Sequence, residues 1–361
     1  MHPSSHLLLT AILIGLFQSG HAHGTKHRHQ HRDTWHLTDT HIHVLPPCYI
    51  SAVAEAGGDP SGFPTPEWSL GGTLRSMKSV GSQKAVLSLS TPGVPIVGTG
   101  EKGRTLCRSV NDYLANITQE APTDIEFFGA LPDWRDIDGT LAEIDYIFKT
   151  QKAAVGVGMY TAYGNLLPGD PTFDPIWEKL NEYKALAFMH PGVMDVNPMF
   201  VAGFLPQPIV DYPQQTTRAA VDLVLRGVRS RTPSVDLILS HAGGTLPYLS
   251  ARASESLVVP EIASSVNVTV TEVQAEFRRF YYDIALSTTE TQLNGLLENT
   301  DTSHVLYGSD YPYAPAVAIQ DAKAKYLSFA NNHPELSPDV LSNNAKRLLV
   351  KHRLSAGGLS D

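Results

Sequence analysis

Five side chains that could bind a metal ion or move a proton stand near the ends of short apolar segments. His41 and His43 are separated by one residue, and in a β-strand residues two apart project to the same face. Two imidazoles on one face can bind a single divalent ion. The alternative is a pair of surface histidines on an edge strand, and the spacing alone does not separate the two.

Three further candidates, His190, His241 and Asp310, each follow a run of apolar residues. A lone histidine in such a place is more often a hydrogen-bonded structural residue, and an acid there can be a cap or turn residue. Their recurrence after the first pair of histidines favours one shared metal site.

The elements that must position these side chains alternate along the chain as short apolar segments and amphipathic helical stretches, which is typical of βα units. We expect helices over residues 70–80, 141–150, 174–183 and 216–228, the third with Asp174 as N-cap and Pro175 at its first position. The expected strands are residues 36–44, 84–90, 126–132, 153–160, 185–191, 235–242, 280–286 and 304–312.

Eight strands of this kind predict a single α/β domain with the (β/α)₈ TIM-barrel fold. A doubly wound open sheet is the alternative, but no Gly-x-Gly-x-x-Gly turn follows the first strand. Two long loops, residues 46–67 and 192–213, leave the carboxyl ends of strands, where a barrel carries its chemistry. We expect these loops to wall the substrate pocket.

Charge and composition exclude one class of partner. The chain has 361 residues, is 42% hydrophobic and carries a net charge of −9, with no run rich in lysine or arginine. Such a chain can bury a large core but offers no basic surface for phosphates. We therefore expect no binding to nucleic acid.

The amino terminus differs from the rest of the chain. Residues 7–17 form an apolar run too short for a bilayer of roughly 30 Å, and small residues at Gly20 and Ala22 suit cleavage of a signal peptide over residues 1–22. We expect a secreted or endomembrane protein with no membrane anchor after cleavage. The sequons at Asn116 and Asn267 would allow it to be a glycoprotein.

Residues 23–35 are rich in histidine and without periodicity, so we expect a disordered leader before a barrel over residues 36–361. Accessory metal binding is the functional alternative for this leader. The two cysteines, Cys48 and Cys107, could form one disulfide in an oxidising compartment or remain buried thiols, and the sequence does not decide.

The motifs in their order resemble the amidohydrolase-2 group of the amidohydrolase superfamily, which includes aminocarboxymuconate-semialdehyde decarboxylase and fungal 6-methylsalicylate decarboxylase. The resemblance spans residues 39–312 and rests on four motifs: Asp39-x-His41-x-His43, His190-Pro191-Gly192, His241-Ala242-Gly243-Gly244 and Gly308-Ser309-Asp310-Tyr311-Pro312. It implies a distorted amidohydrolase-type barrel. It also implies His41, His43, His190 and Asp310 as metal ligands, with His241 as a catalytic residue beside them.

Departures within this resemblance narrow the expected chemistry. Residues 155–160 hold no lysine that could bridge two metals, so one divalent ion is expected, zinc or alternatively manganese. The family places a carboxylate-binding arginine at Arg252, supplied across a homodimer interface. A second family arginine is not clearly matched, because Thr73 occupies its place and Arg75 is displaced. A monocarboxylate is therefore expected.

The resemblance implies a metal-dependent, non-oxidative decarboxylase of a small aromatic hydroxy acid similar to 6-methylsalicylate, which would yield 3-methylphenol and carbon dioxide. Either Asp310 or His241 would place the proton on the ring carbon. The alternatives are a metal-dependent hydrolase of a lactone or amide, with Asp310 as base, and a metal-binding protein without enzymatic activity.

Overall fold

Eight parallel strands form one sheet in which each strand pairs with the next along the chain. The computed structural model describes residues 36–193 and 195–356, so the signal peptide and His-rich leader predicted for residues 1–35 lie outside the described residues. The strands are β1 (Leu37–Val44), β2 (Ser82–Leu89), β3 (Ile125–Gly129), β4 (Ala154–Tyr160), β5 (Leu186–His190), β6 (Asp236–Leu239), β7 (Tyr281–Asp283) and β8 (Val305–Leu306).

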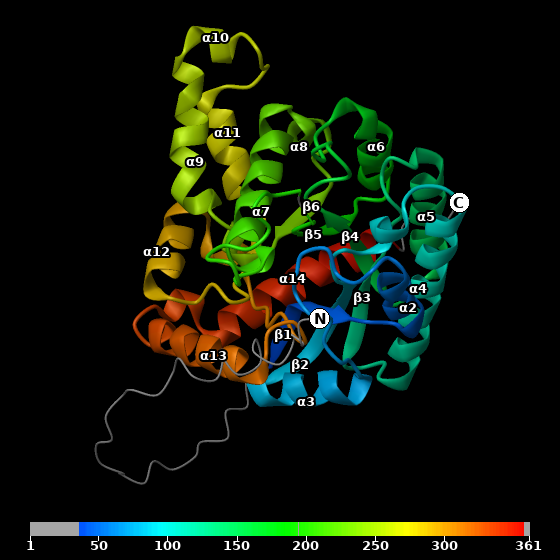
Figure 1. Ribbon diagram of the computed structural model, residues 1–361. Helices are drawn as coiled ribbons and strands as arrows, with labels where there is room; N and C mark the ends of the chain where they lie inside the picture. The colour runs from blue at the N-terminus through cyan, green and yellow to red at the C-terminus, as the bar shows by residue number, and fades with distance from the viewer. Residues whose placement is uncertain (1–35, 194, 357–361) are drawn as a thin grey trace, which may run out of the picture. The chain divides into compact units, whose positions relative to one another are not determined.

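The sheet closes because the chain just after β8 returns to β1. A parallel bridge joins Asp39 to Tyr307, and the Thr40 amide donates to the Tyr307 carbonyl at 3.0 Å. Helices surround the closed sheet (Figure 1). The predicted (β/α)₈ TIM barrel is therefore confirmed.

The helices that cover the strands vary from one turn to more than five turns. They are α2 (Pro47–Glu55), α3 (Leu70–Val80), α4 (Glu101–Glu120), α5 (Ile137–Thr150), α6 (Asp174–Glu182), α7 (Gln207–Leu225), α8 (Val228–Arg231), α9 (Leu246–Glu255), α10 (Pro260–Ala263), α11 (Val270–Arg278), α12 (Glu290–Asn299), α13 (Ala316–Ala330) and α14 (Pro338–Ala356).

The inside of the barrel is a packed core. Phe128 stacks on Phe188 with ring centroids 5.3 Å apart, and the edge of Phe188 meets His41 at 5.0 Å. Leu348 and Leu349 of α14 pack in the same apolar cluster, so this helix covers one end of the barrel interior. The other end of the barrel, where the strands finish, carries the polar side chains.

Helix α2 corrects the prediction of an open loop over residues 46–67. Pro47 occupies its first turn, and Tyr49, Ala52 and Val53 are buried along it. This spacing of three and four residues is the helical pattern that the sequence reading missed. Helix α6 also begins at Asp174 itself, and its N-cap is Phe173 rather than Asp174.

Helix α7 begins at Gln207, whereas the sequence predicted a loop as far as residue 213 and a helix only from residue 216. Pro208 lies in the first turn, and Pro213 lies inside the helix. The helix is held by burial: Tyr212 is only 3% exposed, and the Pro213 carbonyl accepts a hydrogen bond from the Thr217 hydroxyl at 3.1 Å. Tertiary packing here outweighs the local preference of proline.

Cys48 and Cys107 are both free, so the structure favours two thiols over the disulfide alternative. Cys107 is buried, and its thiol donates to the Ala130 carbonyl at 3.1 Å. Within the described part of the chain, no helix is both long and apolar enough to cross a membrane.

Candidate metal centre

Three histidines and one aspartate meet at the end of the barrel where the strands finish. One ligand atom from each lies within 4.8 Å of the other three, and all four residues are buried: His41, His43, His190 and Asp310. The structure thus brings together all four residues that the sequence proposed as ligands. Three imidazole nitrogens and one carboxylate oxygen are a donor set that suits a single divalent ion.

The imidazole of His41 is oriented by a carboxylate that the sequence reading did not single out. Its Nδ1 lies 3.0 Å from both oxygens of Asp283, at the end of β7, so Nδ1 donates and Nε2 points into the cluster. His41 Nε2 is buried, lies 3.4 Å from Asp310 Oδ1, and has no hydrogen-bond partner among the described residues. An unsatisfied buried nitrogen aimed at the other donors fits a bound metal ion.

The other two histidines are oriented in the same way. His43 Nδ1 donates to the Ser88 hydroxyl at 3.1 Å, and His190 Nδ1 donates to the Pro191 carbonyl at 3.0 Å. Each ring therefore keeps Nε2 for the cluster. Burial lowers the pKa of His43, and burial together with the neighbouring His43 and His41 lowers that of His190 well below its usual range. Neutral imidazoles are the form that binds metals.

His41 behaves differently from its neighbours. Burial disfavours its charged form, but the Asp283 and Asp310 carboxylates outweigh burial and raise the pKa of His41 to about 10. Without a metal ion, both nitrogens of this imidazole are protonated at neutral pH. A divalent ion must displace that proton, so its binding strengthens as the pH rises toward 10.

Asp310 does not extend from a strand, as the sequence predicted for residues 304–312, because β8 ends at Leu306. The chain turns instead, and Asp310 adopts a left-handed conformation with φ of 62°. The amides of Ser309 and Asp310 both donate to the His41 carbonyl, at 3.1 and 2.8 Å. This turn is fixed against β1, which compensates for a conformation that non-glycine residues seldom adopt.

The Asp310 carboxylate completes the cluster through one oxygen. Oδ1 lies 3.1 Å from His43 Nε2 and 3.4 Å from His41 Nε2. Burial alone would raise the pKa of Asp310, but the adjacent His41 and His43 imidazoles hold that pKa well below its usual value. Asp310 is therefore an ionised carboxylate at neutral pH.

His241 lies beside the four residues without joining their donor set. Its ring centroid is 4.7 Å from that of His41, and its backbone is also left-handed, with φ of 55°. Its Nδ1 donates to the Ala285 carbonyl at 3.0 Å, and its amide donates to Asp283 Oδ1 at 3.3 Å. Burial and the charge of His41 lower the pKa of His241, so its Nε2 carries a lone pair at neutral pH.

The sequence analysis missed Asp283 because it ends a three-residue strand whose aromatic neighbours indicate only a buried core strand. The signal was a buried carboxylate closing an apolar strand at the barrel's chemical end. It binds the side chain of His41 and the amides of His241 and Ala285, the latter at 3.0 Å. One carboxylate thus orients both histidine positions.

Arg252 is exposed and shares no pocket with the four buried clustered residues in the described part of the chain. It is exposed on α9 and lines a pocket between α7 and α9, together with Arg218 and Leu249. Thr73 is buried on α3 and Arg75 is exposed on the same helix, so no arginine takes the place of the unmatched one. A contact between Arg252 and substrate, supplied by a second protomer, stays a prediction.

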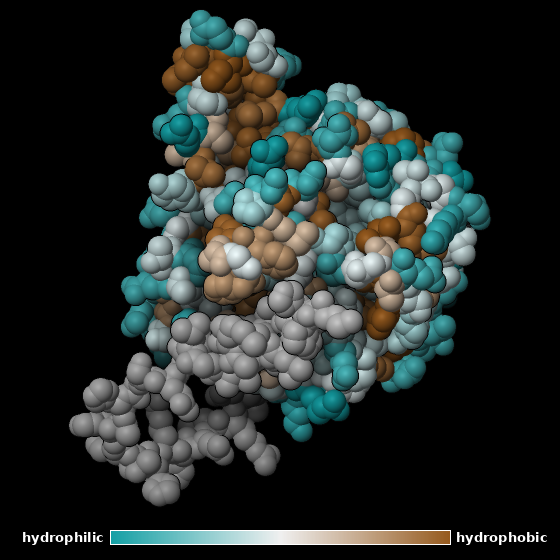
Figure 2. Space-filling model, viewed as in Figure 1, coloured by the Kyte–Doolittle hydropathy of each residue, from teal (hydrophilic) through white to brown (hydrophobic). Residues whose placement is uncertain are grey.

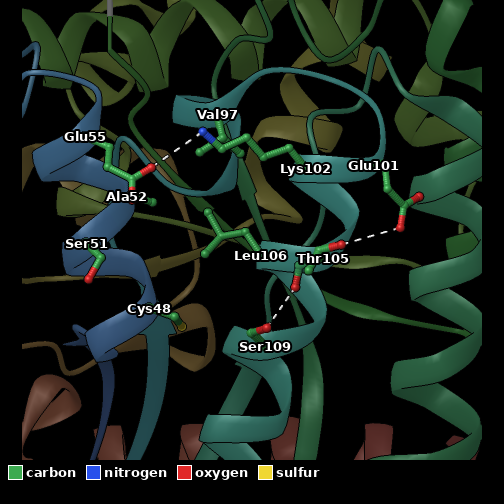
Figure 3. Close-up of a pocket in the computed structure, with 10 residues that line it drawn as sticks. All are labelled: Cys48, Ser51, Ala52, Glu55, Val97, Glu101, Lys102, Thr105, Leu106 and Ser109. Carbon is green, nitrogen blue, oxygen red and sulfur yellow. Dashed lines mark hydrogen bonds and ion pairs between the residues drawn. The ribbon is translucent and has the colours of Figure 1, made fainter.

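A further pocket lies between α2 and α4 on another part of the protein (Figure 3). Its lining includes the Cys48 thiol and the Lys102 and Glu55 pair, whose charged atoms are 3.7 Å apart. None of the four clustered ligands lines it, and we assign it no chemistry.

The chain belongs to the amidohydrolase family, because the Amidohydro_2 family model matches residues 38–350. A decarboxylase named yanB from Aspergillus niger is 36% identical over 329 residues, which cover 88% of this chain and 88% of the relative. A 6-methylsalicylic acid decarboxylase from Penicillium expansum is 38% identical over 284 residues, covering 78% of this chain and 86% of that enzyme.

A solved structure supports the fold. The 5-carboxyvanillate decarboxylase of Novosphingobium aromaticivorans, complexed with manganese and a nitrobenzoic acid, superposes with a TM-score of 0.73 at 19% identity. The match covers 88% of this chain and 96% of that one. At this identity the likeness concerns the fold alone.

The four-residue cluster predicts about one equivalent of bound divalent ion per chain. His41→Ala, His190→Ala and Asp310→Ala should each lose it, while His241→Ala and a chain without residues 1–35 should keep it. Metal analysis by mass spectrometry checks this, and calorimetry in two buffers should detect about one proton released at pH 8. Two ions per leaderless chain, or an ion retained by a His41→Ala and His190→Ala double variant, would contradict the site.

Proposed function

We propose that this protein is a metal-dependent, non-oxidative decarboxylase of small aromatic hydroxy acids. The observation that carries the proposal is the single buried cluster of three imidazoles and Asp310, with His241 beside it, at the end of the barrel where the strands finish. Similarity to the Penicillium enzyme over most of the chain adds the substrate class. An acid resembling 6-methylsalicylate would yield 3-methylphenol and carbon dioxide.

Zinc is our proposed ion, held by His41, His43, His190 and Asp310. Three imidazoles and a carboxylate suit zinc, although manganese also accepts these donors and is present in the related bacterial structure. When bound, the ion supplies a positive charge that orients the acid's carboxylate and neighbouring hydroxyl. The metal analysis described above also identifies the element.

The two candidates for proton transfer both rest in forms that accept a proton, since Asp310 is ionised and His241 is neutral. The proton placed on the ring carbon must therefore come from the substrate hydroxyl or from water. The atoms left for this task are Asp310 Oδ2 and His241 Nε2, because Asp310 Oδ1 and His241 Nδ1 already have partners.

We assign the relay to Asp310 and the hydrogen bond that positions the hydroxyl to His241. Asp310 Oδ2 takes the hydroxyl proton and passes it to the ring carbon that bears the carboxylate. The bond between this ring carbon and the carboxylate carbon then breaks. Its electron pair returns to the ring, and carbon dioxide leaves. Solvent protonates the remaining phenolate oxygen, which balances the reaction.

Metal-replete protein should release carbon dioxide from 6-methylsalicylate, measured together with 3-methylphenol by chromatography. His241→Ala should lower kcat by about 10²- to 10⁴-fold with a smaller change in KM and with the metal retained. Because His241 acts in its neutral form and its pKa is lowered, activity should persist through neutral pH and fall only in acid.

His333→Ala, in the loop after α13, is the matched control and should leave both constants unchanged. Hydrolysis of lactones or amides by the metal-replete enzyme, with every hydroxybenzoate left intact, would replace the decarboxylase proposal with the hydrolytic one.

We further propose a homodimer in which Arg252 of one protomer contacts the substrate of the other. The surface near it is suited to contact, since Tyr248 of α9 is 88% exposed and Val258 is 73% exposed. In the segment formed by α9, α10 and α11, apolar surface is concentrated at the α10 end (Figure 2). A planar guanidinium binds a carboxylate through two parallel hydrogen bonds.

Mixing two defective variants tests this arrangement. Arg252→Ala should raise KM, and His190→Ala should lose the metal, so each protein alone should be weakly active at low substrate concentration. Co-expressed mixed dimers should regain activity, because one of their sites combines an intact cluster with an intact Arg252. A monomer in analytical ultracentrifugation, or no recovery in the mixed dimer, would contradict the proposal.

We also propose that the protein enters the secretory pathway after removal of residues 1–22. Asn116 and Asn267 are both exposed, so a glycan at either position could extend into solvent. Sequencing the amino terminus of the native protein should find a start near His23. Mass spectrometry of its peptides should find glycans at these two asparagines. An intact Met1 and two unmodified asparagines on a cytosolic protein would contradict it.

A further inference from the structure

The carboxylate of Asp39 is buried at the seam where the barrel closes, and the proposed reaction does not use it. The residue is 0% exposed and lies on β1, two residues before His41. An aspartate is rarely buried this completely unless it is paired or hydrogen-bonded. The groups that Asp39 binds therefore indicate its role.

One oxygen of Asp39 binds two segments that lie far apart along the chain. Its Oδ1 accepts a hydrogen bond from the His41 amide at 3.2 Å and another from the Ser309 amide at 3.1 Å. Ser309 directly precedes Asp310 in the turn after β8. Asp39 thus joins the segment that carries His41 to the segment that carries Asp310.

Strand β1 is irregular where these contacts form. Its register against β2 shifts between Asp39 and Ile42, which leaves Thr40 and His41 out of the pairing with β2. Thr40 binds the turn after β8 instead, since its amide and its hydroxyl both donate to the Tyr307 carbonyl at 3.0 Å. Irregularities of this kind occur beside active sites, where they change the direction of a side chain.

The two segments approach each other closely enough that a small displacement would disturb the ligands. A Cβ atom at Gly308 would lie 2.7 Å from the Cβ of His41 and 3.0 Å from Asp283 Oδ1. The Asp310 backbone, with φ of 62°, is in a conformation that non-glycine residues seldom adopt unless their surroundings hold it. The Ser309 amide, bound to Asp39, lies next to this residue and helps to hold it.

We propose that Asp39 is a positioning residue, which fixes His41 and Asp310 relative to each other and so sets the affinity of the metal centre. Its task is to accept hydrogen bonds from two backbone amides, and its negative charge is not required. The inference rests on the metal site that the proposed function uses, but not on the decarboxylation itself. Groups that orient metal ligands in this way contribute about 10- to 100-fold to metal affinity.

Zinc affinity, measured by competition with a chromophoric chelator, tests this role. Asp39→Ala should weaken zinc binding by about 10- to 100-fold. Asp39→Asn should bind zinc nearly as tightly as wild-type protein, because its side-chain oxygen can still accept both amides and only the charge is lost. An Asp39→Asn variant that binds as weakly as Asp39→Ala would overturn the proposal, since the charge would then be what matters.

Asp133→Ala is the matched control for the loss of a buried aspartate. Asp133 is also 0% exposed and also accepts the amide two residues ahead, that of Arg135, at 3.0 Å. This contact stays within the loop between β3 and α5. Asp133→Ala should therefore lower thermal stability and leave zinc affinity unchanged.

Thermal unfolding separates positioning from a general loss of stability. Zinc bound to the folded protein raises the unfolding temperature, and the rise depends on its affinity. The rise should be smaller in Asp39→Ala than in wild-type protein, but undiminished in Asp39→Asn and Asp133→Ala. An undiminished rise in Asp39→Ala would assign the carboxylate to folding alone and overturn the proposal.

Asp39→Ser, whose oxygen lies one bond closer to the backbone, replaces Asp39→Ala in both measurements where the latter does not fold. The same reduced rise is expected. Weaker zinc binding by either variant supports the positioning role even if wild-type protein releases no carbon dioxide, a result that would refute only the decarboxylase proposal.

Discussion

The buried convergence of three imidazole nitrogens and one carboxylate oxygen is the constraint on which the site depends. Each histidine donates its Nδ1 proton to a fixed oxygen, of Asp283, Ser88 or Pro191, so every Nε2 is committed to the same small space. Lone pairs aimed at one another in a buried space repel unless they share a cation. The His41 proton, which the Asp283 and Asp310 carboxylates stabilise, fills this role only in part, and a divalent ion fits better.

The barrel supplies the stiffness that this convergence requires. Its inner core and α14 fill the other end, and the His41 carbonyl holds the turn that presents Asp310. His241 and Asp310 both adopt left-handed backbone conformations that only a well-determined surrounding maintains. Asp283 links the two halves, since it orients the His41 ring and the His241 backbone at once. Chemistry at this end is thus built from several strands rather than from one loop.

How much of the structure the sequence predicts depends on how far apart along the chain the contacting residues lie. The barrel and the candidate residues at its strand ends could be predicted, because alternating segments and polar residues at strand ends are local signals. The choice of His41, His43, His190 and Asp310 as the metal-binding set came from the family resemblance. Helix α2, the early start of α7 and the short β8 could not be predicted, since burial against distant segments decides them. The role of Asp283 could not be predicted either, because its partners His41 and His241 lie far along the chain. The proposed role of Arg252 depends on a second chain, and a single sequence does not show where a second chain binds.

Anomalous diffraction from crystals of the metal-replete protein, recorded on both sides of the metal's absorption edge, tests the central claim most directly. The account predicts one strong peak per chain, within roughly 2.0 to 2.3 Å of Nε2 of His41, His43 and His190 and of an Asp310 oxygen. A peak only at the histidine-rich leader, two peaks inside the barrel, or an empty cluster in protein that contains the metal would contradict it.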